Sequence, residues 1–255
     1  MSPLEQLQLI LNEKYVSEDG DEFKVQLRPG LADEKIDQLA NDLPTSQIPS
    51  DVRDLLRFAS GFEFFGLEEV TFDGVGMFGF ENIFPYSVQL AGDGFGNFWI
   101  LDVDSDGKWN NVFYVCHDPA VVVRHSNDLA EFIKHIDEYG KKEKGSTLEF
   151  IHERAVMDIW RENDGFIDIA DARISADTTL SDFALGLPDH FVIADLRNKP
   201  NAAGFAWGKF GPNIDNAVRH KTALIWGFET RSKQAQPEGL NHQNKKGFFA
   251  RLFGR

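Results

Sequence analysis

Residues 58–107 carry nine carboxylates and ten phenylalanines but no lysine or arginine. The apolar residues between about positions 62 and 124 fall in short segments separated by glycine-rich turns, which predicts short strands. Some of the phenylalanine rings must form a core. The carboxylates have no cationic partner within the run, and their mutual repulsion costs folding stability. Their retention suggests a use, with solubility as the alternative because charge runs usually mark a solvated face.

The net charge of −15 is concentrated in the first part of the chain. Residues 1–145 contain 27 acidic and 12 basic residues, whereas residues 241–255 contain four basic residues and no acidic one. This balance argues against a nucleic-acid partner, because binding to the phosphate backbone requires clustered lysine and arginine. It also disfavours acidic substrates.

The composition is that of a globular protein, with 42% apolar and 26% charged residues. The single cysteine, Cys116, excludes an intramolecular disulfide, fits a reducing compartment and is expected to be a small core residue. The start of the chain lacks the pattern of a secretory signal, and no apolar stretch is long enough to span a membrane. We therefore expect a cytoplasmic protein, and the sequence does not indicate its oligomeric state.

The apolar spacing predicts an α+β fold. Helices are expected over residues 31–43, over residues 50–60 with Ser50 as N-cap, and from Ser126 to about residue 140. Ser146 and Glu149 have capping-box spacing and predict a further helix to about residue 162. The remainder predicts strands at 166–172, 190–196, 204–210 and 222–229 and a short helix at 179–185. The expected organisation is a first domain over 1–145, an α+β segment over 146–235 and a tail over 236–255.

Asp106-Gly107 joins two predicted strands, residues 98–103 and 112–116, into a hairpin. Asp102, Asp104 and Asp106 also match the alternating acidic positions of a calcium loop, but Phe113 stands where that loop requires a glutamate. A solvated hairpin turn is therefore the preferred interpretation, and no metal site is predicted.

The glycines at positions 74, 76 and 79 match the dinucleotide fingerprint, but the residues after them lead into Pro85 and not into a helix. His152-Glu153 lacks the second histidine of a zinc protease, because Val156 occupies that position. Cys116 and His117 would point to opposite faces of a strand and do not form a catalytic pair. We predict no cofactor and no catalytic residue.

The cation-free run predicts instead a negative, partly aromatic surface that steers a basic protein partner into place. The candidate partner-binding residues are its nine carboxylates: Glu63, Glu68, Glu69, Asp73, Glu81, Asp93, Asp102, Asp104 and Asp106.

The end of the chain is basic, in contrast to the acidic run, and its cations surround a cluster of apolar side chains. On a helix these apolar residues would share one face, as in short interfacial anchors. The alternatives are a disordered tail, weak and reversible docking to an anionic membrane, and docking into the groove of a partner protein. The candidate docking residues are Lys245, Lys246, Phe248, Phe249, Leu252 and Phe253.

The order of features over residues 31–140 resembles the SUKH superfamily, the domain of the fungal cell-wall assembly regulator and of many bacterial immunity proteins. The most specific part is Gly92-Asp93-Gly94-Phe95-Gly96-Asn97 with the downstream Asp102, supported by Leu43-Pro44 and by Ser60-Gly61 after the second helix. Many relatives have Asn-Gly where this chain has Ser60-Gly61. The resemblance implies a β-meander, antiparallel or mixed, flanked by helices and without a catalytic centre. Residues 146–255 resemble no family that we can name.

Bacterial members of this superfamily typically bind and neutralise toxins, often nucleases. An acidic surface fits that role, because it can mimic nucleic acid and occlude a basic active site. The leading hypothesis is an immunity-type inhibitor that binds a basic protein, with a regulatory or scaffold protein docking through the tail as the alternative. An enzyme ranks third.

Overall fold

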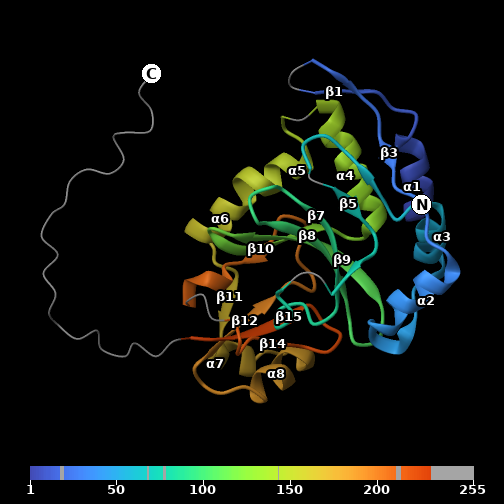
Figure 1. The fold of residues 1–255 in the computed structure, drawn as a ribbon. Coiled ribbons are helices and arrows are strands. Elements are labelled where there is room, and N and C mark those ends of the chain that lie inside the picture. The colour runs from blue at the N-terminus through green and yellow to red at the C-terminus, as the bar shows by residue number, and fades with distance from the viewer. Residues whose placement is uncertain (18–19, 68, 77–78, 143, 211–213, 231–255) are drawn as a thin grey trace, which may run out of the picture.

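The computed structural model describes residues 1–17, 20–67, 69–76, 79–142, 144–210 and 214–230, and its fold is α+β (Figure 1). The tail predicted over 236–255 lies outside the described residues. Within the part of the chain that is described, no helix is both long enough and apolar enough to cross a membrane.

The centre of the molecule is a six-stranded sheet in which every neighbouring pair of strands is antiparallel. Phe98 lies opposite Val115, which confirms the hairpin predicted around Asp106-Gly107. The strands, in sheet order, are β13 (Gly204–Phe205), β10 (Ala120–Ser126), β9 (Trp109–His117), β8 (Phe98–Val103), β7 (Ser87–Gly92) and β6 (Gly74–Val75).

The two faces of this sheet belong to different cores, because successive side chains of a strand point to opposite faces. Trp99 and Leu101 of β8 enter a core shared with helices, whereas Ile100 between them enters a second core. Tyr114 and Phe113 of β9 divide in the same way. The sheet is therefore covered on both sides.

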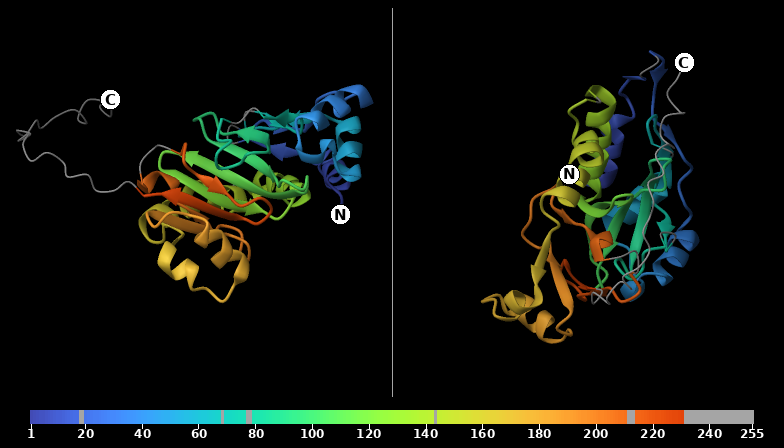
Figure 2. Two further views of the ribbon diagram at one scale, coloured as in Figure 1. Left: turned by 90° about the horizontal axis from the view of Figure 1, so that it is seen from below. Right: turned by 90° about the vertical axis from the view of Figure 1, so that its left-hand side faces the viewer.

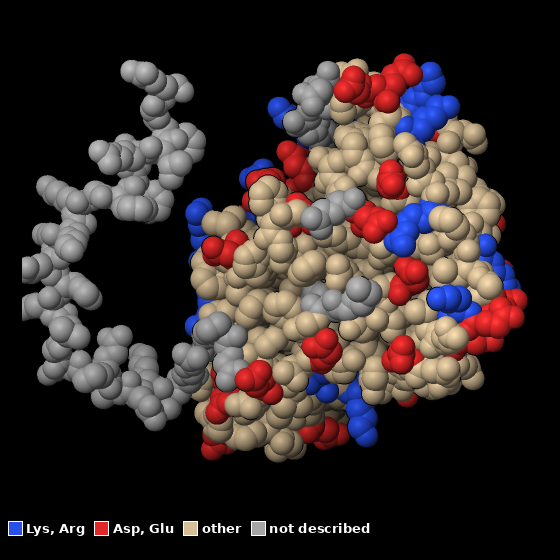
Figure 3. All heavy atoms as spheres, in the orientation of Figure 1, with Lys and Arg blue, Asp and Glu red and all other residues tan. Residues whose placement is uncertain are grey.

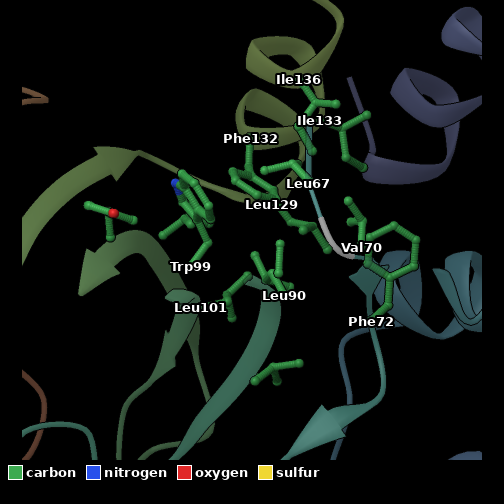
Figure 4. Packing of buried hydrophobic residues seen from close by; sticks show 14 of the residues in the cluster. Leu67, Val70, Phe72, Leu90, Trp99, Leu101, Leu129, Phe132, Ile133 and Ile136 are labelled. Atoms are coloured by element: carbon green, nitrogen blue, oxygen red, sulfur yellow. The ribbon is translucent and has the colours of Figure 1, made fainter. Parts of the chain in front are cut away.

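Helices cover the first face. Helix α4 (Leu129–Lys142) lies beside α1 (Pro3–Ile10) on that face (Figure 2). The predicted apolar stripe of α4 is confirmed, because Phe132 and its neighbours on the helix point at Trp99, Leu90 and Leu101 (Figure 4).

The segment between α1 and the central sheet forms two helices and two small sheets. The predicted helices are confirmed as α2 (Asp33–Asn41) and α3 (Ser50–Phe58), although Pro49 and not Ser50 is the N-cap of α3. The remaining elements are β1 (Tyr15–Val16), β2 (Glu22–Phe23), β3 (Gln26–Leu27), the short 3-10 helix η1 (Pro44–Ser46), β4 (Gly61–Glu63) and β5 (Val70–Thr71). Strand β4 lies between β3 and β5.

The second segment starts with one continuous run of helix. Ser146 accepts a hydrogen bond from the backbone N–H of Glu149, as its predicted capping role requires. The run comprises α5 (Thr147–Glu149), the π-helix η2 (Phe150–Ala155) and α6 (Val156–Arg161). A π-helical turn is rare and often marks a functional site.

A four-stranded sheet in the order β11-β12-β15-β14 follows. The strand predicted at 166–172 ends early because Asp168 caps a helix, and the strand predicted at 204–210 ends at Phe205. The elements are β11 (Phe166–Asp168), α7 (Ile169–Arg173), α8 (Thr178–Leu185), β12 (Phe191–Asp195), the 3-10 helix η3 (Trp207–Phe210), β14 (Val218–Arg219) and β15 (Ile225–Glu229).

The two segments share their cores. Strand β13 of the second segment pairs with β10 at the edge of the central sheet. Trp226 of β15 packs against Phe84 and Phe113, and its indole N–H donates to the carbonyl of Ile83 at 2.7 Å. The boundary predicted at residue 145 thus lies at a turn between two helices, and the chain after it completes the core under the second face of the sheet.

Candidate partner-binding surface

The structure places the nine predicted carboxylates in three different environments. Glu63, Glu69, Glu81 and Asp106 are exposed, whereas Asp73 and Asp93 are half-buried and Asp102 and Asp104 are buried. Glu68 lies outside the described residues. The nine residues therefore do not form one surface.

Asp102 is the clearest correction to the predicted surface. Its Oδ2 lies 2.9 Å from Nη2 of Arg219, and only 1% and 5% of the two side chains are exposed. The Arg219 guanidinium also lies over the ring of Trp226, 4.4 Å from its centroid. Burial raises the pKa of Asp102, and Arg219 opposes that rise. The cation missing from the sequence run is supplied by β14, so Asp102 holds the two segments together and does not face a partner.

Asp104 is occupied within the hairpin turn. Its Oδ1 accepts hydrogen bonds from the backbone N–H groups of Asp106 and Lys108, both at 3.0 Å, and Oδ2 accepts from Asn110. The turn is therefore built around a buried carboxylate and is not simply solvated. In the described part of the chain, no group of three or more histidine, cysteine, aspartate or glutamate side chains could hold a metal ion.

Asp93 organises the glycine-rich turn between β7 and β8. It accepts hydrogen bonds from the backbone N–H of Phe95, from Asn97 and from the hydroxyl of Tyr114, and it lies 3.1 Å from Nε2 of His152 in the π-helix. Burial alone would raise the pKa of Asp93, but these hydrogen bonds outweigh it and hold the pKa below its ordinary value. The turn leaves Phe95 77% exposed.

Glu63 and Glu69 are the two predicted residues that the structure brings together in one cavity. Strand β4 ends at Glu63, and the next two residues, Phe64 and Phe65, stack with their ring centroids 4.9 Å apart. Phe23 of β2 contacts both rings edge-on. These five residues line a groove of about 490 Å³, which we call the acidic-aromatic groove.

Among the described residues, no lysine or arginine lines the acidic-aromatic groove. Glu63 forms no ion pair with any described residue, and Glu69 pairs at 3.2 Å with Arg28 outside the groove. Arg28 and Glu69 are both partly exposed, so solvent screens their attraction and leaves the groove negative.

The other exposed carboxylates lie apart from the groove. Glu81 accepts from the backbone N–H of Gly79, and Asp106 lies in the hairpin turn, where the neighbouring Ser105 N–H donates to the carbonyl of Lys221. Asp73 lines a different cavity, with Lys35 and Asp42 among its neighbours. On the face shown in Figure 3, acidic side chains are separated by uncharged surface and interspersed with basic ones.

Sequence reasoning missed Phe23 and His152. Phe23 comes from a two-residue strand, which is too short to show a periodic pattern. The sequence around His152 suggests only a zinc ligand, and no local pattern connects it with Asp93, which lies 59 positions away in the chain. The predicted core role of Cys116 is confirmed, since it lies in the core under the helices and burial raises its pKa.

The tail-docking residues Lys245, Lys246, Phe248, Phe249, Leu252 and Phe253 lie outside the described residues, so their role stays a prediction.

Comparison with known families identifies one match. Residues 30–135 match the model of the SMI1 / KNR4 family (SUKH-1), which covers less than half of the chain and ends within α4. No curated protein and no solved structure matches the sequence.

Proposed function

We propose, from the match of residues 30–135 to the model of the SMI1 / KNR4 family (SUKH-1), that the protein is a non-catalytic protein-binding module, specifically an immunity-type inhibitor that neutralises a toxin. The family is consistent with an immunity-type or a regulatory role. The inhibitor role is the function that the geometry of the groove supports best.

The observation that carries this proposal is the acidic-aromatic groove. Glu63 and Glu69 offer carboxylates to a lysine or arginine of a partner, and the rings of Phe23 and Phe65 are only half-buried. An aromatic face attracts a cation through its quadrupole, so rings and carboxylates favour the same kind of side chain. A concave site of this composition suits basic side chains projecting from a protein surface.

A nuclease toxin fits this chemistry. A protein that cleaves nucleic acid presents lysine and arginine to the phosphates of its substrate. An acidic inhibitor can pair with those cations, accelerate its own association by electrostatic steering and keep the substrate out.

The test uses the product of a toxin gene neighbouring the gene of this protein, with affinity measured by isothermal titration at low salt. Glu63→Lys/Glu69→Lys should weaken binding by at least about tenfold, the equivalent of about 1.4 kcal/mol. The matched control is Glu34→Lys/Asp51→Lys, which changes the net charge equally at exposed positions on α2 and α3. Asp93 is unsuitable for such a test, because its replacement would disturb the turn it organises.

Equal affinities of the wild type and the groove variant would show that this surface does not bind the toxin. A regulatory role would be favoured if the neighbouring toxin did not bind and affinity purification from the native host recovered a host protein that the groove variant no longer binds.

A further inference from the structure

We propose that a cavity beside the π-helix η2 binds a small organic anion, specifically a carboxylate or phosphate carried on a planar ring. The cavity lies between the glycine-rich turn after β7, the C-terminal end of α4 and the helical run α5–η2, and we call it the π-helix cavity. Its volume of about 620 Å³ is within the range of small-molecule sites. Among the described residues, it shares no lining residue with the acidic-aromatic groove, so the assignment does not rest on the proposed function.

The π-helix contributes three consecutive residues, His152, Glu153 and Arg154, to the lining of this cavity. In an α-helix of 3.6 residues per turn, two side chains that are two positions apart point about 200° away from each other. His152 and Arg154 nevertheless line the same cavity, within the wider turn that the π-helix makes. The irregular turn therefore builds the cavity wall, and such turns are frequent at functional sites.

The carboxylates in the lining are already engaged within the protein. Asp93 accepts the hydrogen bonds described above, and Glu149 accepts one from the backbone N–H of Gly145. Oε1 of Glu153 lies 2.9 Å from Nδ1 of His152. These acidic groups hold the wall of the cavity in place, and their contacts with the protein make them poor candidates for a ligand contact.

The lining groups without a partner are hydrogen-bond donors. Lys144 and Arg154 form no ion pair with any residue that the structure describes. Trp99 is the most deeply buried member of the lining, and its indole N–H has no hydrogen-bond partner within the described chain. Free donors and cations complement an acceptor that carries negative charge, and the planar guanidinium of Arg154 matches the two oxygens of a carboxylate or phosphate.

An exposed ring in the lining indicates the second part of the ligand. Phe95 is 77% exposed, between Gly94 and Gly96 with φ angles of 78° and 85°. Glycine adopts such angles readily, so the turn holds the ring at the surface, where it adds nothing to a core. Tyr139 of α4 lines the same cavity. Because aromatic rings favour offset-stacked or edge-on contacts, a planar ring beside the anionic group suits this lining.

Two sources share this chemistry, aromatic carboxylates and nucleotides, and titration of the full chain with defined probes distinguishes them. The probes for isothermal titration are indole-3-acetate, adenosine monophosphate and inorganic phosphate. We expect one of the two ring-bearing probes to bind with a dissociation constant below about 1 mM, and phosphate alone to bind at least about tenfold more weakly because it lacks the ring. Tighter binding of indole-3-acetate would assign the site to a carboxylate, and tighter binding of adenosine monophosphate to a nucleotide.

Variants at exposed positions decide whether the π-helix cavity is responsible. Arg154→Gln should weaken the binding of the preferred probe about tenfold, because it removes a charged pair, and Phe95→Ala should weaken it about threefold. The matched controls are Arg161→Gln in α6 and Phe150→Ala in the π-helix, which remove an exposed arginine and a partly exposed phenylalanine outside the lining. Both controls should retain the wild-type affinity.

Nuclear magnetic resonance locates the bound probe independently of the variants. The backbone amide signals of Phe95 and His152 should shift during the titration, while that of Asp182 in α8 should not. The proposal is overturned if neither ring-bearing probe binds below about 10 mM, if phosphate alone binds as tightly, or if the two cavity variants bind like their controls. None of these measurements contains a toxin, so ligand binding can fail while partner binding holds, and the reverse.

Discussion

Two carboxylates of the same cation-free run, Glu63 and Asp102, lie in opposite environments. Glu63 is exposed in the acidic-aromatic groove and forms no ion pair with a described residue, whereas Asp102 is buried and paired with Arg219. The difference arises because β4 ends at the surface, while β8 runs through the middle of a sheet that the second segment covers. A run without local cations thus contains both a surface charge available to a partner and an internal charge whose partner comes from 117 residues away.

The largest expected effect is a loss of stability on replacing the buried carboxylate, Asp102. Asp102→Ala leaves the Arg219 guanidinium buried without its counter-ion, which should cost about 3–5 kcal/mol in the free energy of unfolding. Urea unfolding at pH 7 measures this loss. Glu63→Ala is the matched control and should change stability by less than about 0.5 kcal/mol, as is usual for exposed positions. Equal effects would remove the distinction between the two carboxylates.

A second variant separates two contributions to this loss of stability: the unpaired charge of Arg219 and the space left by the Asp102 side chain. Asp102→Ala/Arg219→Met removes both members of the pair, and replacing a buried ion pair by apolar groups is often neutral. The double variant should therefore be more stable than Asp102→Ala alone. A loss equal to the sum of the two single variants would show that the ion pair is not what stabilises this contact.

The next effect concerns Asp93, whose burial is intermediate between that of Glu63 and that of Asp102. Asp93→Asn removes a charge that accepts hydrogen bonds from Phe95, Asn97 and Tyr114, and hydrogen bonds to a charged group contribute about 1.5–3 kcal/mol each. Because an asparagine retains one acceptor oxygen, the expected loss at pH 7 is about 2 kcal/mol. Thermal or urea unfolding measures it.

The pH dependence of that loss has a definite sign. The pKa of Asp93 is lowered in the folded protein, so its contribution to stability is present above the unfolded value of about 3.9 and is lost as the pH falls through the folded pKa. The difference between wild type and Asp93→Asn should therefore shrink toward pH 3. A difference that stays constant with pH would assign the effect to packing.

Local pattern predicted the parts of the fold that local contacts determine. The helix stripes of α3 and α4 and the Asp106-Gly107 hairpin follow from spacings of three to four or of two residues, and all three are confirmed. The groove and the Asp102–Arg219 pair join residues 40 or more positions apart, such as Phe23 with Phe65, and no spacing rule connects them. The strand predicted at 166–172 was wrong beyond Asp168, because a side-chain cap at that residue overrode apolar composition that suited a strand.

A smaller effect tests a third kind of buried polar group, in the core under the helices. His125 is fully buried, stacks on His135 with ring centroids 5.1 Å apart and contacts Trp99 and Phe132. Burial, and secondarily the neighbouring His135, lowers the pKa of His125 well below 6.5, while burial lowers that of His135 against the opposing charges of Glu131 and Glu138. His125 is therefore held neutral in the folded state, and His135 loses its proton more readily there than in the unfolded chain.

The sign of the resulting pH dependence follows from proton binding. Below about pH 6.5 the unfolded chain binds protons that the folded chain does not, so stability should fall as the pH decreases, by up to about 1.4 kcal/mol per pH unit for each histidine. Urea unfolding between pH 7 and pH 5 measures the slope. In His125→Phe the slope should be reduced by the contribution of one histidine. An unchanged slope would mean that His125 is not the group that titrates.

The smallest expected effect is the coupling energy of an exposed ion pair, and it tests the comparison between exposed and buried carboxylates most directly. Glu69 and Arg28 form the surface counterpart of the Asp102–Arg219 pair, and a double-mutant cycle with Glu69→Ala and Arg28→Ala should give a coupling energy of about 0.2–1 kcal/mol. Because both side chains are partly exposed, 1 M salt shortens the screening length to about 3 Å and should nearly abolish that coupling. The same cycle at Asp102 and Arg219 should be insensitive to salt, since water and ions do not reach the pair. Salt sensitivity at both sites, or at neither, would mean that burial is not what separates a carboxylate that stabilises the core from one left available to a partner.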